Sequence, residues 1–280
     1  MIPIAQLKGD MEFYKSLGSL IEVLKLVAAA QYQTLEKKIK TYGLYLDALS
    51  NVFSWLDMQQ VRHPFVTSSD KPGAIVAITT DAGFLGGLNS LVMNKALEEA
   101  KISDSRMVIV GKRGQLYVEK REMVYANFPG VDDLNRLQQA LKLRDYLIEN
   151  VLKGKFGKVA IVFPRALSFT SQRIEVLQVF PFVCETSQKM NNLQISDVIL
   201  ESKFGDIVEY MIYLWLGQKI FEIFGMARLS EQAARFMHLE KCTDRIQDLD
   251  KKLRFQYFRA KHEIIDQNMR ELFAARLLNG

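Results

Sequence analysis

The feature that most limits the possible folds is a pair of apolar stripes, one at each end of the chain, with an average spacing of 3.5 residues. The N-terminal stripe alternates steps of four and three residues, with a one-residue slip near Val27. Its predicted members are Phe13, Leu17, Leu20, Leu24, Ala28, Tyr32, Leu35, Ile39, Tyr42, Leu46, Leu49, Phe53 and Leu56. Only this spacing keeps one face of a helix turned toward a partner helix. The stripe therefore predicts a coiled-coil helix over residues 1–60, in which about 50 residues would span roughly 75 Å.

The C-terminal stripe has the same average spacing. Its predicted members are Leu229, Ala233, Phe236, Leu239, Cys242, Ile246, Leu249, Leu253, Tyr257, Ala260 and Ile264. No proline occurs after Pro181, so nothing of that kind interrupts a helix over residues 204–280. Because a compact middle segment would bring the inner ends of the two helices together, we expect them to pair with each other in antiparallel orientation.

The middle of the chain, residues 72–185, has the pattern of a separate α/β domain. Unbroken apolar runs of this length are typical of strands buried on both faces of a parallel sheet. We expect strands at 74–80, 106–111 and 158–164, an edge strand at 174–182, and helices at 89–100, 112–120 and 131–152. Asp132 and Asp133 would be acids in the first turn of the last of these helices, favoured by its dipole. The predicted fold class is α/β, with a small doubly wound sheet inserted into a long antiparallel coiled coil.

The segment "ITTDAGFLGGLN", residues 78–89, resembles a phosphate-binding loop because three glycines follow a buried strand and an aspartate. It lacks the Gly-Lys that ends a nucleotide-binding loop, and its G-x-x-G-G spacing differs from the dinucleotide fingerprint. Anion binding at a helix N-terminus is one interpretation. We favour the other, in which the glycines allow positive φ and close backbone approach. The residues of this structural loop are Asp81, Gly83, Gly86, Gly87 and Asn89.

Composition excludes several function classes. The net charge of +5 suits an acidic partner surface without indicating nucleic acid, and the two cysteines are far apart, as expected for free thiols in a reducing compartment. The three histidines form no metal-ligand pattern, and no serine has a nearby base. The apolar stretch 207–224 carries Glu209, Lys219 and Glu222, which favours a buried helix over a membrane span. We therefore expect no catalytic residue, metal or cofactor.

Two segments of the C-terminal helix indicate surfaces for partners. In "KKLRFQYFRAK", residues 251–261, cations alternate with aromatic residues. This pattern can bind nucleic acid, but the coiled-coil stripe passes through the same segment, so we favour a coiled coil with solvated cations and expect no nucleic-acid partner. The segment "ELFAARLLNG" is apolar around most of the helix circumference from 272 to 278. A helix end of this kind should be buried in another protein.

Five segments together resemble the gamma subunit of the F-type ATP synthase, in the same order and spacing over nearly the whole chain. They are "KLVAAAQ" (25–31), "RHPF" (62–65), "ITTDAGFLGGLN" (78–89), "VGKRG" (110–114) and "LSEQAARFMHLEKCTD" (229–244). The resemblance implies an asymmetric antiparallel coiled coil with a Rossmann-like middle domain. It also implies that the glycine-rich loop is structural and holds no catalytic nucleotide.

The resemblance further implies a noncatalytic rotor shaft that transmits torque between the membrane c-ring and the catalytic hexamer. The implied partners are the alpha and beta subunits, the epsilon subunit and the c-ring, on the cytoplasmic face of the membrane. Residues implied in partner contacts are Lys261, His262, Asp266, Leu272, Phe273, Leu277 and Leu278. The family pattern has Arg-Gln at 261–262 and Thr at 266, and lysine keeps the charge of arginine without its bidentate geometry. The alternative is a gamma-like coiled-coil adaptor recruited to another assembly.

Overall fold

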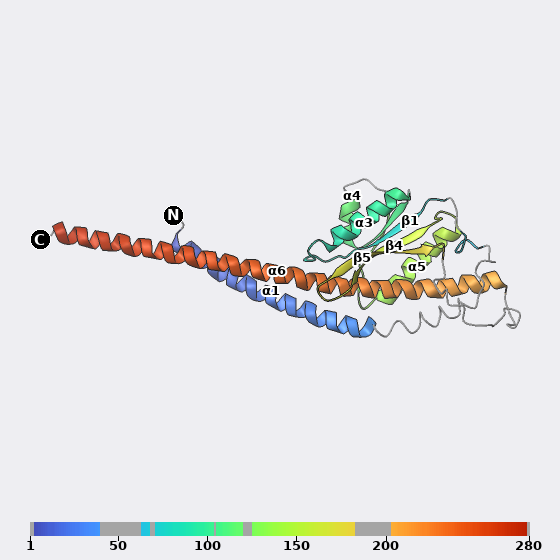
Figure 1. Cartoon of the computed structure of the whole chain (residues 1–280), viewed down its shortest axis with the longest axis horizontal. Helices are drawn as coiled ribbons and strands as arrows, with labels where there is room; N and C mark the ends of the chain where they lie inside the picture. Colours follow the sequence, from blue (N-terminus) through green and yellow to red (C-terminus); the bar gives the residue numbers. More distant parts are fainter. Residues whose placement is uncertain are drawn as a thin grey trace. The chain divides into compact units, whose positions relative to one another are not determined.

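The computed structural model describes residues 3–39, 63–67, 71–103, 105–119, 125–182 and 203–278 (Figure 1). The chain divides into two compact units. The helical unit comprises Met1–Ala29 and Arg235–Gly280, and the sheet unit comprises Ala30–Ala234. Helices α1 (Ile4–Ile39) and α6 (Phe204–Leu278) each contribute residues to both units. The boundaries predicted from the sequence, at 1–60, 72–185 and 204–280, stay a prediction.

The sheet unit is built on five strands in the order β3-β2-β1-β4-β5. The strands are β1 (Ala74–Ile78), β2 (Arg106–Val110), β3 (Tyr125–Phe128), β4 (Val159–Ala166) and β5 (Gln172–Phe180). Central β1 pairs in parallel with β2 and β4, whereas the edge strand β5 pairs antiparallel with β4. The four predicted strands are therefore present. The sequence analysis missed β3, because its four residues, "YANF", carry no apolar run.

Side chains of β1 alternate between two separate apolar clusters. Ala74, Val76 and Ile78 belong to a cluster that includes α5 (Arg136–Leu152) and the first part of α6. Ile75 and Ala77 belong to a second cluster with α3 (Leu88–Ile102) and one residue, Val118, of α4 (Lys112–Glu119). Helices therefore cover both faces of β1, which is why its five residues are all apolar and buried.

The apolar stretch of α6 inside the sheet unit is a buried helix, as the sequence predicted. The α6 residues in the core are Val208, Ile212, Leu216, Ile220, Ile223, Phe224 and Ala227. Its charged residues have partners, because Lys219 pairs with Glu222 at 2.8 Å and the Glu209 carboxylate lies 3.2 Å from the His63 ring. Among the described residues, no helix is long and apolar enough to cross a membrane.

The predicted role of two aspartates as first-turn acids of α5 is wrong. The helix begins at Arg136, so both residues lie in the turn before it. The Asp132 carboxylate accepts hydrogen bonds from the Leu134 amide and from the Asn135 side chain. Asp133 pairs instead with Arg228 of α6. Asp132 therefore stabilises the turn, and Asp133 balances the charge of a distant guanidinium, so neither interacts with the helix dipole as predicted.

Helices α1 and α6 lie side by side in antiparallel orientation, as predicted (Figure 1). In the sheet unit, Tyr32 and Leu35 pack against Leu229 and Ala233. In the helical unit, the Lys25 ammonium lies 2.8 Å from the Glu240 carboxylate. Further toward the N-terminus, Gly18 faces Ile246. Residue numbers thus rise on one helix as they fall on the other.

The first part of the predicted stripe on α1 is wrong. Phe13, Leu20 and Leu24 are exposed, and the predicted slip near Val27 is absent. The buried or half-buried positions that follow each other at steps of four and three are Leu7, Met11, Tyr14, Gly18, Ile21, Lys25, Ala28, Tyr32, Leu35 and Ile39.

The misplacement has a physical reason. Apolar residues alone predict the wrong face, because the pairing face passes through Gly18, which has no side chain, and Lys25, whose charge Glu240 balances. On α6, Leu249 and Ile264 are likewise more exposed than predicted. The predicted stripe residues at 42–56 lie outside the described residues.

Candidate functional site

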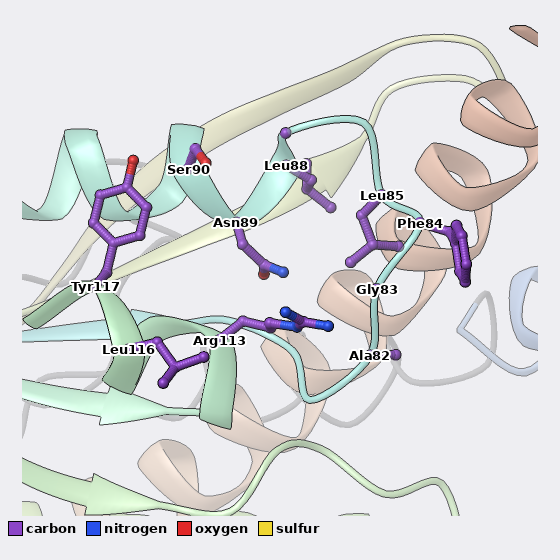
Figure 2. Close-up of a pocket in the computed structure, with 11 residues that line it drawn as sticks. Ala82, Gly83, Phe84, Leu85, Leu88, Asn89, Ser90, Arg113, Leu116 and Tyr117 are labelled. Carbon is purple, nitrogen blue, oxygen red and sulfur yellow. The ribbon is translucent and has the colours of Figure 1, made fainter. Parts of the chain in front are cut away.

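The glycine-rich loop connects β1 to α3 at the carboxyl edge of the sheet, where open α/β folds usually bind ligands (Figure 2). Three residues of the loop have a positive φ: +61° at Phe84, +58° at Gly86 and +97° at Gly87. Glycine adopts these angles without a Cβ clash, whereas phenylalanine does so under strain. Gly86 and Gly87 therefore meet a conformational requirement of the loop, whereas Gly83 has no positive φ.

The polar side chains of the loop are used to hold the loop itself. The Asp81 carboxylate accepts a 2.7 Å hydrogen bond from the Lys112 amide at the start of α4. The Asn89 side chain accepts from the Thr80 amide at 3.1 Å and donates to the Thr80 hydroxyl at 3.0 Å. A ligand would have to compete with these bonds for the same atoms. Their geometry agrees with the structural role that the sequence analysis favoured, which stays a prediction.

A cavity of about 640 Å³ lies between this loop, the first turn of α3 and α4. Its lining residues are Ala82, Gly83, Phe84, Leu85, Gly87, Leu88, Asn89, Ser90, Arg113, Leu116 and Tyr117. Figure 2 shows Asn89 and Arg113 pointing into the space enclosed by the loop, with Phe84 on its outer side. No carboxylate, histidine or thiol is among the lining residues, so the cavity offers no general acid–base pair. The lining combines one cation, Arg113, with apolar and neutral polar residues.

The "VGKRG" segment packs directly against the base of this loop. Gly111 has a φ of +100°, and a Cβ there would lie 2.6 Å from the Thr79 carbonyl oxygen. A Cβ at Gly114 would lie 2.5 Å from the Thr79 hydroxyl, which accepts a hydrogen bond from the Gly114 amide. That hydroxyl in turn donates to the Val110 carbonyl at 2.6 Å. The glycines at 111 and 114 therefore allow β1 and the start of α4 to approach closely.

The position between β1 and β4, where the strand order reverses, is filled by α6. Arg228 and Glu231 of α6, together with Thr79 and Asp81, line a small cavity of about 70 Å³ at this point. This is where a doubly wound fold holds a dinucleotide. In this chain α6 occupies that position, and the remaining cavity has room for little more than water.

Arg228 joins α6 to the segment that precedes α5. Its guanidinium contacts Asp133 at 2.8 Å and Glu231 at 2.5 Å. Burial acts to lower the pKa of Arg228, but the hydrogen bonds and charges of the two carboxylates outweigh it, so the pKa lies above its ordinary value. The side chain stays charged at every physiological pH. Sequence reasoning missed this group because Asp133 lies 95 residues away, although the i,i+3 spacing of Arg228 and Glu231 was visible.

The predicted partner-binding residues of α6 lie in the helical unit. Lys261, His262 and Asp266 are exposed, as are Leu272 and Phe273. Leu277 and Leu278 belong to α6, but their side chains lie outside the described ones. Helix α6 continues past the start of α1, so these residues follow the paired region (Figure 1). Those whose side chains are described are exposed on the end of one helix, and their role in binding a partner stays a prediction.

Residues that could hold a metal are scattered in the described part of the chain, where no group of three or more His, Cys, Asp or Glu side chains gathers. Cys242 is a free thiol whose sulfur lies 3.8 Å from the His238 ring, one helical turn away. The second cysteine, Cys184, lies outside the described residues.

Comparison with known proteins decides the family. A family model described as ATP synthase matches residues 4–276, almost the whole chain. The chain belongs to the ATP synthase gamma-chain family. The sequence resemblance is thereby confirmed over both terminal helices and the sheet unit.

Similar proteins support this membership along their full length. The chain is 22% identical over 277 residues to the ATP synthase gamma chain of Clostridium kluyveri, covering 96% of this chain and 95% of that one. It is 25% identical over 316 residues to the gamma chain of a Synechococcus species, covering 99% and 100%. The fold matches a chain in the rotor of Euglena gracilis mitochondrial ATP synthase with a TM-score of 0.65 at 20% identity, covering 94% and 98%.

Proposed function

We propose that this chain is the noncatalytic central shaft of an F-type ATP synthase, which transmits torque between the membrane ion-driven c-ring and the catalytic alpha/beta hexamer. The observation that carries the proposal is the family match over residues 4–276, which includes both terminal helices as well as the middle of the chain. Relatives that share only a sheet domain would not produce such a match. The partners are then the alpha and beta subunits, the epsilon subunit and the c-ring.

The structure supplies parts that suit this task. Two antiparallel helices joined by apolar packing and by the Lys25–Glu240 pair resist bending better than one helix alone. The anchoring of α6 by Arg228, between Asp133 and Glu231, ties the helix to the turn before α5. The position of a nucleotide is filled by that helix. These features support a mechanical role for the chain rather than a catalytic one.

The site roles belong to the same proposal. Lys261, His262 and Asp266 would make polar contacts to a beta-subunit loop, and the apolar end of α6 would seat in an uncharged collar of the hexamer. Exposure of Leu272 and Phe273 supports the second role, because large apolar side chains at a helix end otherwise remain in water. We place the shaft at the cytoplasmic face of the membrane as a peripheral part of the complex.

Native mass spectrometry of the tagged chain, purified from its own cells, tests the proposal. We expect a complex with three alpha subunits, three beta subunits and one copy of this chain. If alpha and beta are absent and other proteins are retained, the chain is a gamma-like adaptor and the shaft role is refuted.

A truncation after Glu271 tests the mechanical role of the tip. Removing residues 272–280 should weaken coupling between ATP hydrolysis and ion transport in the reconstituted complex, while the urea midpoint of the isolated chain stays unchanged because Leu272 and Phe273 are exposed. The matched control is the full-length chain with Leu272→Ser and Phe273→Ser, which removes the apolar surface and keeps the helix length. Unchanged coupling in both variants would contradict seating of the tip in a collar.

A further inference from the structure

Two arginine residues of α5 are buried against α6, although arginine is rarely buried in proteins unless it is paired. Arg136 and Arg144 are 6% and 7% exposed, and in the described part of the chain they are the only lysine or arginine residues that are buried. Both lie in the sheet unit, as do the residues of α6 that they contact. Taking a guanidinium out of water is costly unless good partners replace the water. The contacts of the two side chains with α6 must compensate this cost.

Each buried arginine lies over an aromatic ring of α6. The guanidinium carbon of Arg144 is 3.6 Å from the centre of the Tyr213 ring, and that of Arg136 is 4.3 Å from the centre of the Phe221 ring. Both distances are within the range of a cation–π interaction, which is strongest where water is excluded. Arg144 also donates hydrogen bonds to the Tyr213 hydroxyl and to the Asp145 carboxylate.

Each arginine also lies against a glycine of α6, about one helical turn after the ring. A Cβ at Gly217 would be 3.1 Å from the Arg144 Nη1, and a Cβ at Gly225 would be 3.2 Å from the Arg136 Nη1. These separations are tighter than an ordinary van der Waals contact, so a side chain at either position would push the guanidinium away. Because glycine is unfavourable inside a helix, the space that it leaves for an arginine accounts for its presence at both positions.

Both contacts combine an arginine, an aromatic ring and a glycine, and we name them the arginine sites. One consists of Arg144, Tyr213 and Gly217, and the other consists of Arg136, Phe221 and Gly225. Corresponding residues are eight positions apart on both helices. Eight residues of an α-helix advance about 12 Å along the axis and, beyond two full turns, about 80° around it. The arginine sites therefore contact α6 at two levels along its axis and at two angles around it.

Contacts arranged in this way oppose rotation of α6 about its own axis. The apolar core of the sheet unit also holds α6, but hydrophobic contact is non-directional and opposes a small rotation only weakly. A guanidinium that is stacked on a ring beside a glycine loses this contact when the helix turns, because the interaction depends on the relative geometry of the two groups. The Arg228 guanidinium, 2.8 Å from the Asp133 carboxylate, adds a third directional contact between α6 and the turn before α5.

We propose that Arg136 and Arg144 are positioning residues that fix the rotational angle of α6 within the sheet unit, so that torque applied to this unit passes into α6 without slippage. This inference rests on the proposed function. Helix α6 is continuous from the sheet unit into the helical unit, so an angle that is fixed in the first is transmitted to the second. An apolar residue of similar size would avoid the desolvation cost of a buried arginine. A role in fixing one arrangement of the two helices therefore accounts for the arginines better than a role in stability.

The experiment measures the ions transported per ATP hydrolysed by the complex purified with the tagged chain from its own cells and reconstituted in lipid vesicles. The test variant carries Arg136→Met and Arg144→Met, because methionine is a good helix former that adapts to the space left by a guanidinium. The charge control carries Lys95→Met and Lys219→Met, which remove two cations whose carboxylate partners lie on the same helix as the cation. The stability control is Ile212→Val, which loosens the buried core around α6 and leaves both arginine sites intact.

We expect the complex of the test variant to retain alpha and beta and to hydrolyse ATP, but to lose ion transport per ATP, whereas both controls match the wild-type chain. The urea midpoint of the isolated test variant should not lie below that of Ile212→Val, because replacing a buried cation by an apolar side chain is often neutral. Coupling equal to that of the wild-type chain overturns the role of the arginines while the shaft role stands. An equal loss of coupling in Ile212→Val also overturns it, because lost stability would then be the cause.

A wild-type chain that retains no alpha or beta overturns both this inference and the shaft role. If the double variant does not assemble, Arg144→Met alone carries the test, since it removes one arginine site and keeps the other. A smaller loss of ion transport per ATP is then expected, and unchanged coupling in this single variant overturns the inference.

Discussion

Replacing Gly18 of α1 by alanine should stabilise the helical unit, although this glycine lies on the pairing face. Gly18 has helical backbone geometry, and the nearest atom to an added Cβ outside its own helix would be the Ile246 Cγ2, at 3.7 Å. That separation is an ordinary van der Waals contact. The cavity of about 500 Å³ beside Gly18, between α1 and α6, leaves space for the methyl group.

The expected magnitude follows from helix propensity. Alanine is favoured over glycine inside a helix by about 0.8–1.0 kcal/mol, mainly because glycine loses more backbone freedom on folding. The new contact with Ile246 adds a few tenths of a kcal/mol in the same direction. We therefore expect Gly18→Ala to stabilise α1 by about 1 kcal/mol, which slows local opening about fivefold.

Amide hydrogen exchange of α1 peptides in the full chain measures this effect directly, because exchange reports the free energy of local opening. Gly9→Ala is the matched control: no atom lies within 4 Å of the Cβ it would add, so only the propensity gain applies. Faster exchange in Gly18→Ala, with slower exchange in Gly9→Ala, would contradict this prediction. It would mean that the two helices are closer at this level than the structure places them.

Four further substitutions test the loop, its neighbour Gly111 and the helix pair. Gly111→Ala should cost at least about 2 kcal/mol of unfolding free energy in urea, because φ is +100° and the new Cβ would lie 2.6 Å from a carbonyl oxygen. Asn89→Ala should cost about 1–2 kcal/mol by removing the bonds to Thr80, and Asn89→Asp, which keeps the acceptor, should cost less. The Glu240 hydrogen bond is the main reason why the pKa of Lys25 lies above its ordinary value of 10.5. The stabilisation that this hydrogen bond adds is therefore present below pH 10.5 and is lost as the pH rises through the raised pKa of Lys25. The urea midpoint should accordingly fall more steeply above about pH 10 in the wild-type chain than in Lys25→Met.

The candidate site was only partly visible before the fold. The left-handed backbone at Gly86 and Gly87 could be predicted, because glycine is the residue that such angles favour. The strained Phe84 could not be predicted, since phenylalanine carries no such preference. The hydrogen bond from the Lys112 amide to the Asp81 carboxylate could not be predicted either, because the two residues lie 31 positions apart in the sequence.

Local sequence patterns were sufficient to predict the family and all described elements except β3. Apolar period and length distinguish buried strands from helices, because a strand buried on both faces needs every side chain apolar and a helix needs one in about 3.5. That local rule found β1, β2, β4, β5 and every helix assigned in the described residues, and motif order identified the family.

The tertiary structure was needed to identify the pairing face of α1. Apolarity marks two faces of that helix, and the choice between them depends on what α6 presents at each level: Ile246 opposite Gly18 and Glu240 opposite Lys25. It also decided that Arg228 and Glu231 fill the place of a nucleotide, since Asp133 meets them only once the sheet has formed. The physical reason is the same in both cases. Local sequence determines which surroundings a residue prefers, whereas the side chain that contacts it comes from a distant part of the chain.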